Sequence, residues 1–498
     1  MTTLLQILSI ARSGNPTRAW SLFHAAGWDE RIDEPKALTL KGRLLKDRAK
    51  ATSGTECKRY YGKAAQAYML AAEIEGDNSY PLINAATLAL LGGNAGRSIE
   101  LAKETLSLID RDPTQGENAY WRAATRSEAL LLLGNDSAAR RTLTEAIAKL
   151  PLAWEDHAAT IGQFELILSE QGKDGSWLDR HRPPASLYFS GMIGLDENNP
   201  KTLSTIKEVI DNKAPRFGFG ALAAGADILI AEALLKSGAE LHVTLPYSID
   251  RFREVSVTPF GRQWVPRFDA LVESAVNVYS LPEMPSAEER SLDAAVEMAN
   301  LVAMGHSIRN AGLLRSTANA LTIVDLGKKP GRNFPSWLAS DRDYTVIEAD
   351  RKPNMVRGSG SNPIDNTSDT LCATLFLGNV CKEIADIQQS QQIEFTKVGS
   401  GYCFESTQIL QVCAIAKSVA KKFDGIRASL MIDVMDRDNP SQLVLEQAKD
   451  IALASSGGSV LTDYKSAMVL TLLSKENSIQ EIGELKTAYG AIPIWIIA

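Results

Sequence analysis

The chain has 498 residues, of which 45% are hydrophobic and 23% charged, and its formal net charge is −7. This length predicts about three domains, and the ordinary composition predicts folded, globular ones. The negative charge disfavours an extended nucleic-acid surface, and no apolar run approaches the ~20 residues of a spanning helix. We therefore expect neither a nucleic acid nor a membrane as partner.

The cysteines and the N-terminus predict a cytoplasmic protein. An odd number of cysteines without a Cys-x-x-Cys pair is a poor disulfide framework and favours reduced thiols. The first apolar run has no basic region before it and is broken by Arg12, which predicts a helix rather than a signal peptide. The cysteines are Cys57, Cys372, Cys381, Cys403 and Cys413.

Residues 1–178 are predicted to form paired helices, because Gly-Asn pairs recur at 14–15, 93–94 and 134–135. Glycine after one helix and asparagine before the next are typical of a tight turn between helices. Their recurrence predicts an α-solenoid. The region resembles tetratricopeptide repeats, and residues 79–88 resemble the TRAFs-binding repeat region of signalling proteins. The resemblance implies a protein partner; a spacer or a dimer surface is the alternative.

Residues 179–352 alternate apolar strands with helices, which predicts an open parallel α/β sheet with a ligand crevice beyond the carboxyl ends of its strands. The predicted helices include 202–210, 266–274 and 292–314. The predicted strands are 186–190, 216–220, 241–245, 275–279, 321–325 and 344–347.

A glycine-rich turn at 217–227, between a strand and the helix 228–235, is the candidate ligand site. The start of a helix offers free N–H groups to a phosphate, and glycine lets a ligand approach the backbone closely. A tight turn without a ligand fits the same spacing. Asp227 is expected either to cap its helix or to bind a ribose hydroxyl. Glu232 is either a catalytic acid/base or an exposed residue of the helix surface. The candidate binding residues are Ser190, Gly191, Gly218, Gly220, Gly225, Asp227 and Pro246.

The run from Gly225 to Pro246 is similar to the SLOG superfamily, as are His181–Pro184, Phe189-Ser190-Gly191 and Phe252 with Ser256-Val257. This is a Rossmann-like group that binds nucleotides and their derivatives, and the resemblance implies a nucleotide ligand of unspecified identity on the glycine turns. The hydrolase branch of the group carries Pro-Gly-Gly-x-Gly-Thr-x-x-Glu, which residues 223–227 do not reproduce. The resemblance therefore implies binding more directly than bond cleavage.

Residues 366–498 are predicted to form an α+β domain with strands at 373–377, 426–432, 459–462 and 494–497, helices at 409–420 and 443–454, and a hairpin at 395–404. The order and spacing of these elements resemble those of a class III nucleotidyl cyclase homology domain, which has a ferredoxin-like fold. Such cyclases hold two metal ions with two aspartates. This chain has Gly378-Asn379-Val380 and Gly399-Ser400 at those positions.

The same resemblance places Glu446 and Asp450 where an Asn and an Arg normally act. It implies an inactive pseudo-cyclase without a metal site, kept for homodimerisation. Asp433, Asp436 and Asp438 are expected to form an exposed hairpin turn, with a substitute metal site as the alternative.

These expectations combine into a cytosolic nucleotide-signalling protein. Its SLOG-like domain binds the nucleotide, its repeats hold a protein partner, and no further cofactor is expected. Two alternatives stay open. In one, the SLOG-like site is a hydrolase that cleaves an N-glycosidic or phosphate bond with Glu232; in the other, the whole chain is a protein-binding scaffold. A working cyclase would need both aspartates from a second chain.

Overall fold

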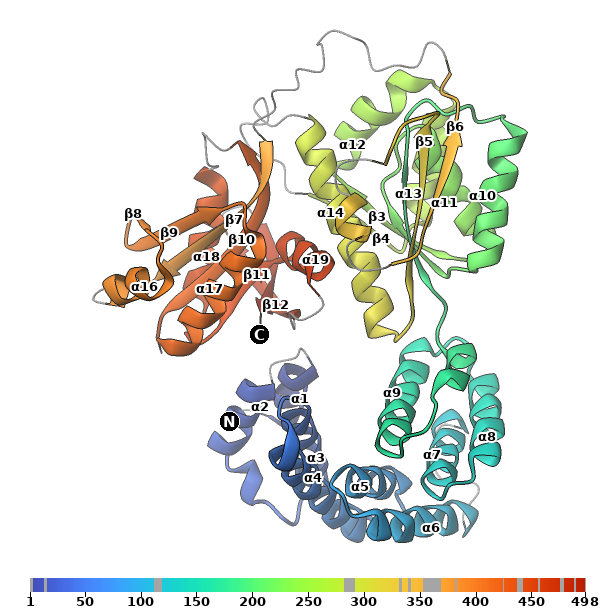
Figure 1. The fold of residues 1–498 in the computed structure, drawn as a ribbon, viewed down its shortest axis with the longest axis vertical. Helices are drawn as coiled ribbons and strands as arrows, with labels where there is room; N and C mark the ends of the chain where they lie inside the picture. The colour runs from blue at the N-terminus through green and yellow to red at the C-terminus, as the bar shows by residue number, and fades with distance from the viewer. Residues whose placement is uncertain are drawn as a thin grey trace. The chain divides into compact units, whose positions relative to one another are not determined.

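The computed structural model describes residues 3–12, 16–111, 119–281, 292–330, 334–338, 342–352, 369–380, 383–423, 425–436, 442–455, 457–474, 479–487 and 490–497. The chain divides into two compact units (Figure 1). The first consists of Met1–Pro183 with Leu313–Arg315, and the second of Pro184–Gly312 with Ser316–Ala498.

The first unit is helical throughout its described part, which confirms the predicted helical N-terminal region. From α1 to α8 each helix packs on the next, and α5, α7 and α9 also pack on one another along the inner side of the curved stack (Figure 1). Its elements are α1 (Leu4–Arg12), α2 (Pro16–Ala25), η1 (Trp28–Glu30), α3 (Pro35–Lys50), α4 (Gly54–Glu75), α5 (Ser79–Leu91), α6 (Ala95–Arg111), α7 (Ala119–Leu132), α8 (Asp136–Lys149), α9 (Trp154–Glu170) and η2 (Ser176–His181).

The predicted Gly-Asn turns join these helices. Gly93 and Gly134 have positive φ values of 88° and 76°, which end α5 and α7 at no steric cost. The side chain of Asn94 accepts from Arg97 N at 3.1 Å, and that of Asn135 accepts from Ala138 N at 3.3 Å, so each caps the following helix. The third pair, at 14–15, lies outside the described residues.

The second unit begins with the predicted parallel sheet, in the order β4-β3-β2-β1-β5-β6. Every pair of neighbouring strands is parallel. The order reverses between β1 and β5, and ligands of open parallel sheets bind at such a switch point. The elements are β1 (Ser186–Gly191), α10 (Pro200–Lys213), β2 (Phe217–Gly220), α11 (Ala226–Lys236), β3 (Glu240–Leu245), α12 (Ile249–Phe252), η3 (Arg253–Val257), η4 (Thr258–Phe260), α13 (Trp264–Ser274), β4 (Asn277–Ser280), α14 (Leu292–Leu313), β5 (Ala318–Asp325), α15 (Phe334–Leu338) and β6 (Tyr344–Ala349).

A second, mixed sheet follows in the order β12-β13-β11-β10-β7-β9-β8. The β10–β11 pair is parallel and the other pairs are antiparallel. The predicted hairpin is present, with Gly399 at φ 57° in its turn. The elements are β7 (Asp369–Gly378), α16 (Glu383–Gln391), β8 (Thr396–Val398), β9 (Gly401–Ser406), α17 (Ile409–Lys422), β10 (Arg427–Asp436), α18 (Gln442–Ala454), β11 (Val460–Asp463), α19 (Tyr464–Leu473), β12 (Ile479–Thr487) and β13 (Gly490–Ile497).

Helix α14 joins the two sheets into one hydrophobic core, because buried residues of α14 pack with residues of both. A Cβ at Gly305 would lie 1.9 Å from Met468 O, so α14 and α19 approach too closely for any other residue there. The hydroxyl of Tyr464 lies 2.9 Å from His306 Nδ1, and Arg309 donates to Ile479 O at 2.7 Å. Burial lowers the pKa of His306 to about 3, so this imidazole is neutral at physiological pH.

The expected exposed turn at Asp433 is wrong. Asp433 lies within β10 and is only 1% exposed. Its carboxylate lies 2.5 Å from Lys465 Nζ, and Lys465 is itself buried on α19. The sequence pattern missed this because strand β10 continues through Asp436 instead of ending before the aspartates. The position of Asp438 lies outside the described residues.

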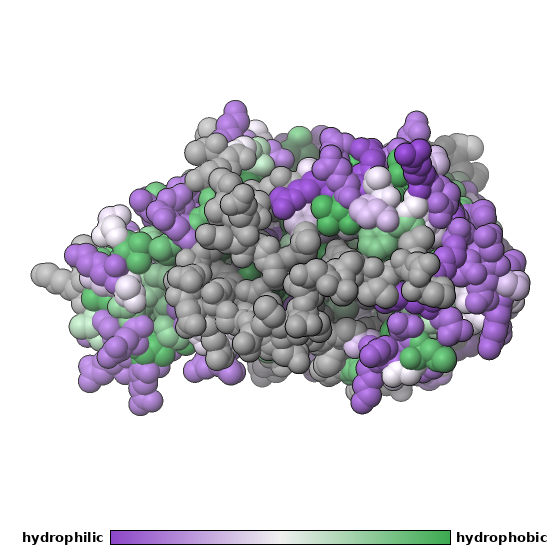
Figure 2. Space-filling view, turned by 90° about the horizontal axis from the view of Figure 1, so that it is seen from above, coloured by the Kyte–Doolittle hydropathy of each residue, from purple (hydrophilic) through white to green (hydrophobic). Residues whose placement is uncertain are grey.

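No helix in the described part of the chain is long and apolar enough to cross a bilayer. On the face drawn in Figure 2, hydrophilic residues dominate the coloured surface and the hydrophobic ones occur in small separate groups.

We expect Lys465→Met to lower the free energy of unfolding by about 3–5 kcal/mol, because it removes the ammonium that the buried Asp433 faces. Urea denaturation followed by circular dichroism measures this. The exposed Lys449→Met on α18 is the control and should change stability by less than ~0.5 kcal/mol. The double change Asp433→Leu/Lys465→Met should recover much of the loss. Equal stability of Lys465→Met and wild type would show that the pair contributes nothing.

Candidate nucleotide-binding cavity

A cavity of about 270 Å³ opens at the carboxyl edge of the parallel sheet, beside the switch point between β1 and β5. Its walls come from the ends of β1 and β3, the turn before α11, the segment η3–η4, helix α14 and the residues after β6. The lining residues are Ser190, Gly191, Ile193, Ala221, Ala223, Asp227, Pro246, Phe252, Ser256, Phe260, Val296, Ala299, Asn300 and Arg351.

The structure brings four of the predicted binding residues to this cavity: Ser190, Gly191, Asp227 and Pro246. Ser190 donates to Thr322 Oγ1 of β5 at 3.2 Å, which fixes its side chain across the switch point. A Cβ at Gly191 would lie 2.4 Å from Ala226 Cβ and 3.1 Å from Ile323 O. Only glycine therefore allows the end of β1 to pack against the start of α11.

Three predicted glycines do not line the cavity. Gly218 and Gly220 lie within β2, where an added Cβ would meet Leu234 Cδ1 at 2.7 Å and Phe189 O at 2.5 Å, so both serve close packing. Gly225 precedes α11 with φ 128°, a conformation that favours glycine. A Cβ at Gly225 would lie 2.8 Å from Met192 O.

The turn before α11 uses its own N–H groups to hold its shape. Ala224 N donates to Ser256 O at 3.0 Å and Ala226 N donates to Met192 O at 3.2 Å. Ala223 N donates to the Asp227 carboxylate at 3.1 Å. These three donors are engaged within the protein, so they do not form the simple phosphate cradle that the glycine spacing predicts.

Asp227 is the buried acid of the cavity. It is 6% exposed, and its Oδ1 meets no hydrogen-bond partner among the described residues. Burial raises the pKa of Asp227 to about 7. The backbone N–H groups of Ala223 and Gly191 oppose this shift, because they favour the charged carboxylate. Asp227 lies in the first turn of α11 without capping it. Near neutral pH it exists in both protonation states.

Arg351 and Asn300 supply the other polar groups of the wall. Arg351 follows β6, and its Nε lies 3.5 Å from an Asp325 carboxylate oxygen. Its position is fixed by the next residue, because Lys352 N donates to Gly194 O at 3.0 Å. Asn300 lies on α14. Sequence analysis missed both residues, although the rule that polar groups after parallel strands face the crevice points to Arg351.

Glu232, the candidate acid/base, is not among the lining residues. Both of its carboxylate oxygens accept from Arg267, each at 2.6 Å. Such a bidentate ion pair holds the Glu232 side chain against Arg267 of α13. The arrangement gives Glu232 no contact with the cavity.

The wall therefore combines an acid, a guanidinium and an amide with apolar and aromatic side chains, including Phe252 and Phe260. An apolar concavity with a small number of convergent polar groups is typical of small-molecule sites. The volume lies just under the ~300–1,000 Å³ common for such sites, which suits a small organic ligand.

The positions that resemble the cyclase metal site hold no carboxylate. The amide of Asn379 donates to Gly425 O at 3.0 Å, and Ser400 lies in the β8–β9 turn. Within the described residues, no three His, Cys, Asp or Glu side chains are grouped to hold a metal ion.

The fold and this cavity define a multidomain α/β protein with helical repeats. Residues 3–89 match the family model described as Tetratricopeptide Repeats-Sensor, TPR-S, which confirms the predicted repeats over that stretch. The match covers α1 to α5 and leaves the two sheets outside it. A comparison with curated proteins returned no match.

Similar solved structures include two cyclases. The catalytic core of a rhodopsin-guanylyl cyclase with converted specificity, in complex with ATPalphaS, is 10% identical with a TM-score of 0.21, and the match covers 26% of this chain and 96% of that one. The adenylyl cyclase CyaB from P. aeruginosa is 12% identical with a TM-score of 0.20, and the match covers 26% of this chain and 94% of that one. A mutant O-GlcNAc transferase from Thermobaculum terrenum is 16% identical with a TM-score of 0.17, and the match covers 70% of this chain and 58% of that one.

We expect Asp227→Asn to gain stability relative to wild type as pH rises. The pKa of Asp227 is raised from 3.8 to about 7, so between these values the folded state holds a proton that the unfolded chain has lost. Folding stability of the wild type therefore falls with pH by up to ~1.4 kcal/mol per unit in this window. The free-energy difference between variant and wild type should rise by ~1–3 kcal/mol from pH 5 to pH 8 in urea titrations.

The control is Asp250→Asn, whose side chain is 87% exposed. Its stability difference from wild type should stay flat over the same pH range. A flat difference for Asp227→Asn as well would mean that the cavity carboxyl is ionised throughout.

Proposed function

We propose that the protein binds a nucleotide or nucleotide-derived molecule in the cavity and acts in nucleotide signalling. The observation that carries the proposal is the placement of Asp227, Asn300 and Arg351 around one apolar cavity at the switch point of a parallel sheet. A carboxylate accepts hydrogen bonds from ribose hydroxyls, and a guanidinium binds phosphate. The resemblance of residues 225–246 to the SLOG superfamily supports the same ligand class.

In the proposed orientation the phosphate lies towards Arg351 and the sugar towards Asp227. The ligand phosphate avoids the turn before α11, because Ala223, Ala224 and Ala226 already donate their N–H groups within the protein. Phe252 and Phe260 contribute apolar surface for the base. Cleavage of the ligand is left out of the proposal, since Glu232 is paired with Arg267 outside the cavity.

The other parts of the chain have separate roles in the proposal. The repeat region suggests interaction with a protein partner, in line with the TPR-S match over residues 3–89. The C-terminal α+β domain, which resembles a class III cyclase without its metal aspartates, serves as a homodimerisation module. A scaffold that only binds proteins is the competing function, and it predicts that no nucleotide binds.

We expect isothermal titration with nucleosides, their 5′-monophosphates and cyclic nucleotides to identify a ligand. Arg351→Gln should weaken monophosphate binding about tenfold or more, because it removes a charge-assisted hydrogen bond worth ~1.5–3 kcal/mol, and should leave nucleoside affinity unchanged. Ala223→Phe, which fills the cavity, should abolish both. The matched control is Arg262→Gln, an exposed arginine outside the cavity wall.

The outcomes separate the proposal from its alternatives. If no member of the panel binds wild-type protein, the nucleotide function is rejected in favour of the scaffold. If Arg351→Gln weakens nucleosides and monophosphates equally, the phosphate does not lie at Arg351.

A further inference from the structure

Four cations gather on the inner face of the helical unit, the face formed by α3, α5, α7 and α9. Arg43, Lys46 and Lys50 follow one another along α3 at intervals of about one helical turn, so they share one side of the helix. The fourth, Arg315, belongs to the segment Leu313–Arg315 of the same unit. This local charge is opposite in sign to the net charge of −7 of the chain.

Two of these cations converge on adjacent residues of α9. Lys46 Nζ donates to the side-chain oxygen of Gln163 at 2.6 Å. A Cβ at Gly162 would lie 2.5 Å from Arg315 Nε, so the guanidinium rests directly on the helix backbone there. The Lys46–Gln163 contact thus brings α3 opposite α9, and the charge of Arg315 acts on Lys50 of α3.

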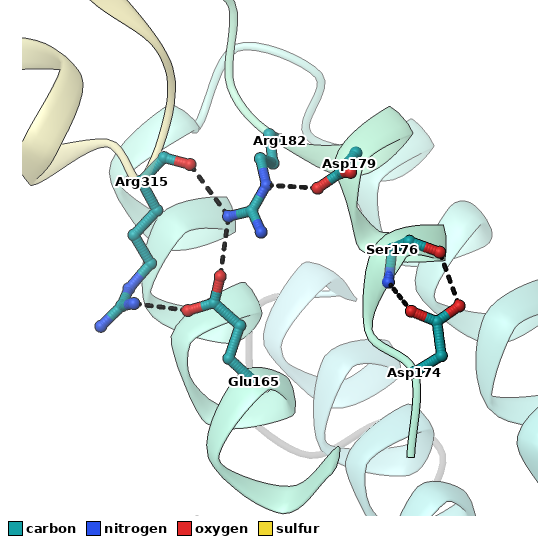
Figure 3. A network of polar contacts seen from close by, with 6 residues as sticks. All are labelled: Glu165, Asp174, Ser176, Asp179, Arg182 and Arg315. Carbon is teal, nitrogen blue, oxygen red and sulfur yellow. Dashed lines mark hydrogen bonds and ion pairs between the residues drawn. The ribbon is translucent and has the colours of Figure 1, made fainter. Parts of the chain in front are cut away.

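Arg315 is held in place by a network that Figure 3 shows. Its guanidinium donates to Glu165 at 2.5 Å, and its backbone oxygen accepts from Arg182 at 3.0 Å. Arg182 also contacts the same Glu165 carboxylate at 2.8 Å. The backbone of Arg315 has φ 51°, which costs about 1–2 kcal/mol outside glycine. The network offsets this cost, so Arg315 is positioned before any ligand arrives.

The neighbouring acids do not neutralise the cluster. Glu165 is shared between Arg182 and Arg315. Asp47 lies 4.0 Å from Lys50, at the limit of an ion pair. Glu128 accepts from Thr87 at 2.5 Å, and burial raises its pKa, which favours its uncharged form.

Burial and the repulsion between neighbouring cations lower the pKa values of both lysines in the cluster. Burial lowers the pKa of Lys46 to about 8, and the charges of Lys50 and Arg43 lower it further, whereas Glu128 and Asp47 act in the opposite direction. Burial also lowers the pKa of Lys50, with Arg315 and Arg43 adding to the effect. Arg43 Nε is buried, and no described residue accepts a hydrogen bond from it. An N–H donor without an acceptor among the described residues lies beside several positive charges. An anion bound at this position would accept from the donor and offset the repulsion between the charges.

We propose that the cationic cluster of Arg43, Lys46, Lys50 and Arg315 is a binding site for a small multivalent anion, of the chemistry of a di- or triphosphate group. Guanidinium groups bind phosphate oxygens in a bidentate manner, and ammonium groups add charge without strict geometry. The half-buried setting strengthens each of these interactions relative to open water. The free polyphosphate and the phosphate chain of a nucleotide share this chemistry.

An acidic peptide is the less suitable ligand. A peptide bound along a solenoid needs contacts spread over several repeats. Here the cations are confined to one side of α3 and to Arg315, which rests on α9. A compact anion with several charges matches this arrangement better.

The test is isothermal titration of the full chain with inorganic triphosphate, ATP and an acidic peptide of equal charge. We expect triphosphate and ATP to bind wild type, and Lys46→Gln/Lys50→Gln to weaken both at least tenfold. The control Lys63→Gln/Lys103→Gln removes two exposed lysines from α4 and α6 of the same unit and should change little. The cavity variant Ala223→Phe should leave triphosphate binding intact, which separates this site from the nucleotide cavity.

Proton uptake gives a second readout that a purely structural cluster would not show. An anion stabilises the charged Lys46, whose pKa of about 8 then rises, so binding at pH 8 should take up a fraction of a proton. Titrations in buffers of different ionisation enthalpy measure it, and affinity should fall as pH rises from 7 to 9. If the double variant does not fold, Arg43→Gln provides the same comparison. Wild-type affinity in the folded variants, absence of triphosphate binding, or preference for the peptide would overturn the proposal.

Discussion

The close contact between α14 and α19 is the constraint on which the second unit depends. Gly305 lets the two helices touch at backbone distance, and His306 and Arg309 add polar contacts to Tyr464 and Ile479 on the same side. The neutral state of His306 is enforced by burial, so this contact carries no charge of its own. Through α14, the mixed sheet and one side of the parallel sheet therefore share a hydrophobic core.

Helix α14 also contributes to the cavity wall through Val296, Ala299 and Asn300, about one and a half to two and a half turns before Gly305. One rigid helix thus contacts the proposed ligand and the C-terminal domain. A ligand that binds differently to two positions of α14 would change the packing against α19, because packed cores shift between discrete arrangements. This is the physical route by which nucleotide binding in the cavity would reach the proposed dimerisation domain.

Much of the fold follows from local sequence signals. The strand ending at Leu245 stops at Pro246, and the helices of the first unit turn at Gly93 and Gly134, so apolar periodicity and breaker residues were sufficient there. Strand β12 was missed because its residues are largely polar and exposed at a sheet edge. Helix α19 was missed because it follows β11 without an intervening loop, capped only by Asp463, which accepts from Ser466 N at 2.9 Å.

The candidate site was predictable only in part, for a physical reason that also bears on the proposed orientation of the ligand. Ser190 and Gly191 end β1, Pro246 follows β3, and Asp227 lies in the first turn of α11, where strand and glycine signals point. Asn300 lies on α14 and reaches the wall only through tertiary packing. Glycine spacing alone predicts a phosphate at the start of α11. The structure fills that position with the Asp227 carboxyl, which takes the N–H of Ala223. The N–H of Ala223 is therefore not free for a phosphate, and the side chain of the cavity wall that carries a positive charge is Arg351.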